Sequence, residues 1–255
     1  MQLRLDSSLA EGFSSNAQRA RVITEAWVSS NIYCPRCGNS RLTKVRNNAP
    51  VKDFCCEQCF SNYELKSKSS KFASEIPDGA YSTLIEQIEE NRNPDFLFLH
   101  YDKRNLDILN MFVVPKHFLT PDVIKQRKPL SANARRSGWV GCNILLSRIP
   151  EQGRIFIVSD GRVVPTREVL DKFSKMSFLE KTDSKNRKWI LDIVDCVNRL
   201  GKKEFKLEEV YHFESVLAGL HPDNKNIKAK IRQQLQILRD KGFLQFNGSG
   251  EYLLL

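Results

Sequence analysis

The sequence has no long hydrophobic run and no recognisable secretion signal. No stretch of about eighteen apolar residues occurs, which argues against a transmembrane helix. The first residues, Met-Gln-Leu-Arg-Leu-Asp, lack the apolar core of a signal peptide. The sequence also has no basic amphipathic helix with aromatic anchors, which a membrane-surface protein would use. We therefore expect a cytoplasmic protein that does not bind membranes.

Acidic residues are few relative to basic ones. The chain has 40 lysines and arginines against 30 aspartates and glutamates, which gives a net charge of +10. Lysine and arginine release condensed counterions when they meet phosphates, so such an excess favours a polyanionic partner. Nucleic acid is the expected partner. A length of 255 residues with 41% hydrophobic content allows one large domain or two small ones.

The odd number of cysteines argues against a disulfide framework. There are 7 cysteines, and four of them form the pairs Cys34-Pro-Arg-Cys37 and Cys56-Glu-Gln-Cys59, with 18 residues between the pairs. Two such pairs at this separation predict one structural Zn²⁺ held by four thiolates. Cys55 is an alternative ligand, although Cys56 matches the spacing of the first pair better. The remaining cysteines fit a reducing compartment.

A possible nuclease centre is interleaved with the cysteines. Pro50-Val-Lys-Asp53 precedes the second pair, and Glu64-Leu-Lys66 follows it. In an extended strand Glu64 and Lys66 point to the same face. Asp53, Glu64 and the carbonyl of Leu65 can hold a hard cation such as Mg²⁺, while Lys66 orients or helps deprotonate an attacking water. A solvated strand face explains Glu-x-Lys alone equally well, because 27% of the residues are charged.

Longer runs carry a resemblance to a known family. They are Pro77-Asp-Gly-Ala-Tyr81, Gln126-Arg-Lys-Pro-Leu130 and residues 134–143 and 231–240. With the cysteines and the Asp53, Glu64 and Lys66 triad, they resemble the DpnI-like methyladenine-dependent restriction endonucleases within the PD-(D/E)XK nucleases, along essentially the whole chain. The resemblance implies Mg²⁺-dependent cleavage of double-stranded GATC that carries N6-methyladenine.

The expected fold is an α/β PD-(D/E)XK nuclease domain with inserted zinc knuckles of four cysteines, followed by a winged helix. We place the nuclease domain at residues 1–180, the winged helix at 181–255 and a polar linker at 180–187. Apolar periodicity predicts helices at 16–30, 77–91 and 165–175 and strands at 96–101, 109–114, 139–146 and 154–159. It predicts helices at 189–200, 207–217 and 224–241 before a terminal hairpin at 242–255. Glu25 in the first helix either lies near the metal or, as we favour, is solvated.

Two segments are candidates for DNA contacts. The basic loop within residues 116–143 offers Arg127, Lys128, Arg135, Arg136 and Trp139. The arginines can grip phosphates or guanine edges, and the Trp139 ring can pack against a methyl group. A surface charge run with a core tryptophan is the alternative.

The second segment is the third helix of the expected winged helix. It offers Lys228, Arg232, Gln233 and Gln236 on a face separate from its apolar stripe. Glutamine can pair with the N6 and N7 edge of adenine, although a solvated helix face is the alternative.

Three functions are consistent with these residues. The first is a methyl-directed type II restriction endonuclease, expected as a monomer on double-stranded DNA. The second is a DNA-binding regulator with a zinc ribbon and a winged helix but no cleavage. The third is a repair nuclease of the same fold that recognises branched DNA rather than methylation. The regulator has no use for a converging triad, whereas both nucleases need one.

Overall fold

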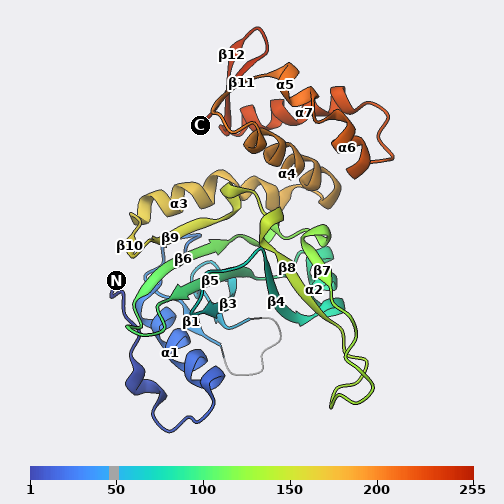
Figure 1. Ribbon diagram of the computed structural model, residues 1–255. Helices are drawn as coiled ribbons and strands as arrows, with labels where there is room; N and C mark the ends of the chain where they lie inside the picture. The colour runs from blue at the N-terminus through green and yellow to red at the C-terminus, as the bar shows by residue number, and fades with distance from the viewer. Residues whose placement is uncertain (46–51) are drawn as a thin grey trace. The chain divides into compact units, whose positions relative to one another are not determined.

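The computed structural model describes residues 1–45 and 52–255, which form two compact units (Figure 1). The first unit comprises Met1–Ser174 and the second Lys175–Leu255. Pro50 of the expected nuclease motif lies outside the described residues. Within the described part of the chain, every helix is too short or too polar to cross a bilayer. The expected boundary at residue 180 stays a prediction.

A mixed sheet of seven strands forms the centre of the first unit. Its strand order is β1-β2-β3-β5-β6-β9-β10. The strands are β1 Thr43–Lys44, β2 Phe54–Cys55, β3 Asn62–Lys68, β5 Asp95–Tyr101, β6 Ile108–Val114, β9 Ile155–Ser159 and β10 Arg162–Val163. Strand β3 runs parallel to β5, and β5 pairs with β6 in the antiparallel sense. The predicted α/β class is thereby confirmed.

The middle of this sheet is apolar because it is covered on both faces. All seven residues of β5 are buried, as expected for a near-continuous apolar run. Helix α1, Asn16–Asn31, packs its buried Ile23, Trp27 and Val28 into the same core cluster as Leu97 and Leu99. The Trp27 indole N–H donates a hydrogen bond of 2.7 Å to the carbonyl of Gln2. Helix α1 is therefore fixed beside β3, which carries Glu64 and Lys66.

A second sheet replaces the beginning of a predicted helix. Residues 77–80 belong to β4, Glu75–Ala80, and α2 runs only over Tyr81–Glu89. Strand β4 pairs with β8, Gly141–Leu145, which also pairs with β7, Ile124–Gln126. The helix start predicted at Pro77 was therefore wrong. Pairing with distant residues, such as Asp78 with Cys142, overrides the local signal of a proline followed by an aspartate.

The second unit has the helices and small sheet of a winged helix. Its helices are α4 Ser184–Arg199, α5 Leu207–Tyr211, α6 Glu214–Leu220 and α7 Ile227–Asp240. Its strands β11 Glu204–Lys206, β12 Leu244–Gly248 and β13 Glu251–Leu254 form one sheet in the order β11-β13-β12. The predicted terminal hairpin is confirmed by the antiparallel pairing of β12 with β13.

Two details of this region differ from the prediction. Most of the linker expected at 180–187 is helical, because a 3-10 turn runs to Lys181 and α4 begins at Ser184, where Asp183 caps the helix by accepting a hydrogen bond of 3.0 Å from the Asn186 N–H. The single helix expected at 207–217 is divided between α5 and α6.

The remaining elements are one helix and several short turns. Helix α3, Thr166–Lys175, spans the boundary of the two units after Ser174. Short 3-10 turns occupy Ser7–Ala10, Lys116–Phe118, Pro121–Val123, Leu146–Arg148, Glu151–Gly153 and Ser177–Lys181.

Candidate metal and nuclease centre

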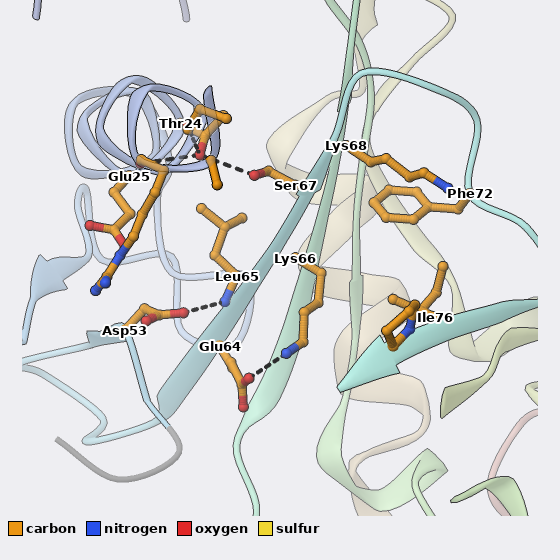
Figure 2. Close-up of a pocket in the computed structure, with 14 residues that line it drawn as sticks. Thr24, Glu25, Asp53, Glu64, Leu65, Lys66, Ser67, Lys68, Phe72 and Ile76 are labelled. Carbon is orange, nitrogen blue, oxygen red and sulfur yellow. Dashed lines mark hydrogen bonds and ion pairs between the residues drawn. The ribbon is translucent and has the colours of Figure 1, made fainter. Parts of the chain in front are cut away.

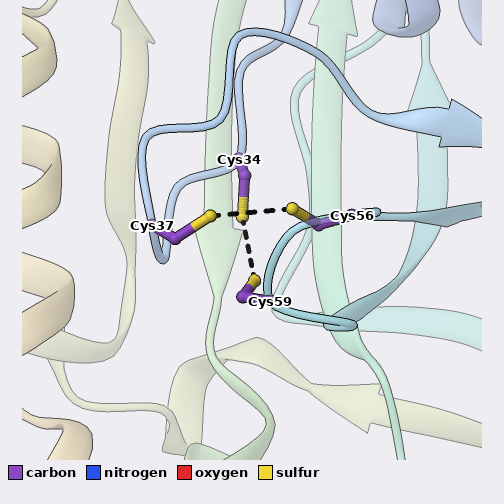
Figure 3. Close-up of side chains that lie close together, drawn as sticks. All are labelled: Cys34, Cys37, Cys56 and Cys59. Atoms are coloured by element: carbon purple, nitrogen blue, oxygen red, sulfur yellow. Dashed lines mark hydrogen bonds between the residues drawn. The ribbon is translucent and has the colours of Figure 1, made fainter.

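Four cysteine side chains meet at one point in the first unit (Figure 3). The Sγ atoms of Cys34, Cys37, Cys56 and Cys59 all lie within 4.8 Å of one another. Two of the separations, Cys34 to Cys59 and Cys37 to Cys56, are 3.6 Å. A tetrahedral Zn²⁺ with bonds of about 2.3 Å holds its sulfurs about 3.8 Å apart. The four predicted ligands therefore fit a zinc ion, and Cys55 is not part of the cluster.

The surroundings of the cluster combine burial with hydrogen-bond donors. Burial raises the pKa of the Cys34 thiol, whose Sγ lies 3.1 Å from the Tyr63 hydroxyl. Burial also opposes ionisation of Cys56, but the backbone N–H groups of Cys59 and Gln58 outweigh it and lower the pKa of Cys56 to about 6. Since the thiolate is the form that binds a metal, these N–H groups favour the metal-binding form of Cys56.

Hydrogen bonds hold Asp53 against strand β3. The Asp53 N–H donates to the Tyr63 carbonyl at 2.8 Å, and the Val45 N–H donates to the Asp53 carbonyl at 2.8 Å. The next residue, Phe54, pairs with Tyr63. The Asp53 carboxylate accepts a hydrogen bond of 2.8 Å from the Leu65 N–H. The pairing of β2 with β3, which flank the second cysteine pair, thus fixes the carboxylate beside the backbone of Leu65.

Asp53, Glu64 and Lys66 line one cavity of about 590 Å³. Its walls come from helix α1, strand β3, Asp53 and the segment around Phe72 and Pro77. Figure 2 shows the Lys66 amine pointing to the Glu64 carboxylate, with Asp53 next to the backbone of Leu65. The Lys66 Nζ atom lies 2.6 Å from the Glu64 Oε1 atom. This contact confirms that Glu64 and Lys66 share one face of the strand.

The electrostatics of the cavity suit a cation. Burial raises the pKa of Glu64 to about 7, while the Lys66 ammonium opposes the rise and the Asp78 and Asp53 carboxylates add to it. Burial alone would lower the pKa of Lys66, but Glu64 and Asp78 outweigh it and raise that pKa. Carboxylate oxygens are the ligands that Mg²⁺ prefers, and Asp53 and Glu64 both line this cavity. Binding of Mg²⁺ by Asp53, Glu64 and the Leu65 carbonyl stays a prediction.

Two acidic residues at the cavity differ from expectation. Glu25 is only 4% exposed and lines the cavity, so its interpretation as a solvated helix residue was wrong. Arg21 at 2.5 Å and Lys44 at 2.7 Å neutralise it, which explains how a glutamate is tolerated there. Asp78 forms an ion pair with Lys66 and was missed as a site residue. The sequence signal was the run Pro77-Asp-Gly-Ala-Tyr81, which was assigned to a helix start.

Comparison with known families covers both units. The family described as DpnI, the Dam-replacing family, matches residues 1–182. The Dam-replacing HTH domain matches residues 185–253. The chain belongs to the DpnI family. Membership in the DpnI family confirms the resemblance noted in the sequence and supports a methyl-dependent restriction enzyme with a DNA-binding HTH domain.

In this DpnI-family chain, the basic loop joins β7 to β8 and projects from the small sheet (Figure 1). The two sides of the loop are joined by hydrogen bonds from the Leu130 N–H to the Trp139 carbonyl at 2.9 Å and from the Gly138 N–H to the Leu130 carbonyl at 3.1 Å. The guanidinium carbon of Arg136 lies 4.6 Å from the centre of the Trp139 ring. The predicted basic contacts Arg127, Lys128, Arg135 and Arg136 are exposed, and Trp139 is half-buried.

The Trp139 ring is held by its own loop. It packs over the backbone of Gly141, where an added Cβ would lie 2.8 Å from two ring carbons. Only glycine leaves room for this close approach. The ring is therefore neither a member of the main core cluster nor a free surface group. This position leaves the alternative of a core tryptophan without support.

The predicted readers of the HTH domain lie on α7. Lys228, Arg232, Gln233 and Gln236 are exposed, while Ile227, Ile231, Leu235 and Leu238 are buried. The Arg232 guanidinium donates to the Tyr211 hydroxyl at 2.8 Å, and the Lys228 amine lies 3.4 Å from the Glu214 carboxylate. The division into an apolar and a polar face is confirmed, whereas the contacts of these four side chains with bases stay a prediction.

Proposed function

We propose that the protein is a type II restriction endonuclease that cleaves double-stranded DNA at GATC sites carrying N6-methyladenine, in a reaction that needs Mg²⁺. The observation that supports catalysis most directly is the convergence of Asp53, Glu64 and Lys66 on one cavity. DpnI-family membership supports the methyl-dependent class. The GATC target rests on the family resemblance.

Asp53 and Glu64 are proposed to bind the catalytic Mg²⁺ together with the carbonyl of Leu65. Bound there, Mg²⁺ would polarise the phosphodiester and offset the charge that develops on its oxygens. Asp53 is already oriented, because its Oδ2 atom is held by the Leu65 N–H at 2.8 Å. Glu64 lies in the same cavity and is ready to give up its proton near neutral pH.

Lys66 is proposed to orient the attacking water. Its neighbours raise its pKa, so its amine stays protonated at neutral pH. An ammonium donates hydrogen bonds and cannot take a proton from water. Between the two roles considered from the sequence, orientation of the water is therefore favoured over its deprotonation.

DNA reading is proposed to use both units. The exposed arginines of the β7–β8 loop can hold phosphates, and the Trp139 ring can provide an apolar wall for the methyl group. Helix α7 offers Gln233 and Gln236 as candidate adenine readers. Each such contact discriminates by only about 1 to 3 kcal/mol, so two readers sharpen selection for methylated sites.

Two plasmids that differ only in adenine methylation at GATC test the proposal. With excess Mg²⁺, the protein should cut the methylated plasmid and leave the other intact. The Asp53→Ala variant should bind the methylated plasmid but not cut it, since the cavity loses a metal ligand. Trp139→Ala should lower the ratio of the cleavage rate on methylated plasmid to that on unmethylated plasmid, and should lower it more than it lowers DNA affinity.

The same assay separates the other functions. Equal cutting of both plasmids would refute methyl dependence, and preferential cutting of branched DNA would favour a repair nuclease. Binding without any cutting at a range of Mg²⁺ concentrations would favour a regulator. An unchanged rate ratio in Trp139→Ala would remove Trp139 as a reader of the methyl group.

A further inference from the structure

The Lys66 amine contacts a second carboxylate, which comes from a different sheet. Lys66 lies on β3 of the seven-stranded sheet, whereas Asp78 lies on β4 of the three-stranded sheet. Their ion pair is well shielded, because the Asp78 side chain is 5% exposed and that of Lys66 is 19% exposed. Shielded ion pairs hold their geometry better than pairs on the surface. The amine is therefore fixed from two directions, by Glu64 on its own strand and by Asp78 opposite.

The backbone of β4 places the Asp78 carboxylate against the Lys66 amine. The pairing of β4 with β8 shifts register between Asp78 and Ala80, so Gly79 forms a bulge. A bulge bends its strand and re-aims the neighbouring side chain. The Gly79 N–H also donates a hydrogen bond of 2.7 Å to the Asp78 Oδ1 atom. The oxygen that meets Lys66 is thus already held by the bulge.

The same small sheet carries the base of the loop proposed to read DNA. Asp78 pairs with Cys142, and Ala80 pairs with Gly141, on which the Trp139 ring is packed. The Tyr81 N–H donates to the Val140 carbonyl at 3.1 Å, and the Arg127 N–H donates to the Gly141 carbonyl at 2.9 Å. Asp78 therefore connects the amine of Lys66 to a sheet that also holds the loop.

We propose that Asp78 is a positioning residue for the cleavage reaction, which fixes the Lys66 amine beside the scissile phosphate and in register with the β7–β8 loop. This inference rests on the proposed nuclease function. Glu64 is also a proposed cation ligand, and a bound cation would compete with Lys66 for its oxygens. Asp78 then remains as the carboxylate partner that keeps the amine in place. Asp78 itself acts through Lys66 and binds neither DNA nor metal.

Glu75 provides a matched control on the same strand. Its carboxylate accepts hydrogen bonds of 2.8 Å from Lys125 and from Asn143, whereas the carboxylate of Asp78 meets the Lys66 amine. Glu75→Gln and Asp78→Asn each remove one negative charge from β4 and keep the size of the side chain. A general effect of charge or of β4 stability would appear in both variants. An effect through Lys66 would appear only in Asp78→Asn.

The experiment measures single-turnover cleavage, DNA affinity in Ca²⁺ and the Mg²⁺ concentration for half-maximal rate, on folded full-length protein. Asp78→Asn should lower the cleavage rate about 10- to 100-fold, the range expected when a reacting group is displaced by about 1 Å. Its DNA affinity and its Mg²⁺ requirement should stay within about twofold of the wild-type values. Asp78→Glu should recover part of the rate, and Glu75→Gln should cleave normally.

Other results would overturn the inference in distinct ways. A normal rate in Asp78→Asn would show that Lys66 needs no second carboxylate. A higher Mg²⁺ requirement with a normal maximal rate would make Asp78 a metal ligand. Equal losses in Asp78→Asn, Asp78→Glu and Glu75→Gln would indicate a merely structural role. Absence of cleavage by the wild-type protein would refute the nuclease function itself and this inference with it.

Discussion

Glu64 shows how one buried carboxyl links metal binding to pH. Its pKa is raised to about 7, first by burial and then by neighbouring carboxylates. Below that pH the proton occupies the oxygen that a cation would need, so ion binding must release it. Above that pH the carboxylate is already ionised, and no proton has to be displaced. The metal affinity of the cavity should therefore depend on pH in a range where ordinary glutamates do not titrate.

This linkage predicts the Mg²⁺ requirement of cleavage. The Mg²⁺ concentration for half-maximal cleavage should fall by roughly tenfold between pH 6 and pH 8, and level off above pH 8, because one proton on a group with a pKa of about 7 competes with the ion. Cleavage rates measured over a Mg²⁺ series at each pH give this value separately from the maximal rate. A half-saturating concentration that is equal at pH 6 and pH 8 would contradict the prediction.

Individual residues also show where sequence reasoning succeeds and fails at the site. Glu64 and Lys66 could be placed on one face because strand alternation is a local rule. The buried positions of Glu25 and Asp78 could not be predicted, because each depends on an ion pair with a residue more than ten positions away: Lys44 for Glu25 and Lys66 for Asp78. A buried acid with a remote basic partner has the same local pattern as a solvated one.

At the scale of elements, helix α7 exposes two kinds of side chain that are proposed to contact DNA. Lys228 presents a charge that can meet a phosphate, whereas Gln236 presents an amide that can pair with a base edge. Both side chains are exposed in the protein. A phosphate contact contributes affinity for any sequence, while a base contact contributes only for the correct base. Single substitutions should therefore separate affinity from specificity.

Two substitutions on α7 are expected to act differently. Lys228→Ala should weaken binding to all sequences and reduce the slope of log affinity against log salt concentration by about 1. Gln236→Ala should keep that slope and reduce the preference for GATC over a changed site by about 1 to 3 kcal/mol. Fluorescence-anisotropy titrations over a salt series measure both quantities. If neither substitution changed the salt slope or the preference for GATC, α7 would be a solvated face without a role in reading DNA.

Elements were predictable where their own residues decide the structure. The apolar run of β5 and the apolar stripe of α7 predicted a buried strand and a packed helix. The short strand β4 was not predictable, because Pro77 and Asp78 favour a helix start and only pairing with β8 makes them extended. Residues 207–217 likewise contain no helix breaker such as proline or glycine, so their division into α5 and α6 could not be predicted from local sequence.

At the scale of the whole molecule, the cysteine cluster adjoins the segment that carries Asp53 into the cavity proposed for catalysis. Asp53 lies between the two Cys-x-x-Cys pairs and contacts β3 directly, next to the pairing of β2 with β3. Strand β2 has only two residues, so it offers few backbone hydrogen bonds to hold this segment in place. Zinc bound by the four thiolates would add a constraint, since its binding free energy is also folding free energy.

Zinc loss should therefore abolish cleavage even when Mg²⁺ is in excess. Cys56→Ser removes one ligand, so it should lower the zinc content and reduce cleavage by at least about 100-fold, the scale of a displaced catalytic group. Cys55→Ser is the matched control, because Cys55 is adjacent but not part of the cluster. It should keep one zinc per chain and cut normally. Zinc content by elemental analysis, circular dichroism and plasmid cleavage are measured on the same samples. A zinc-free Cys56→Ser protein that cuts at the normal rate would show that strand pairing alone positions Asp53.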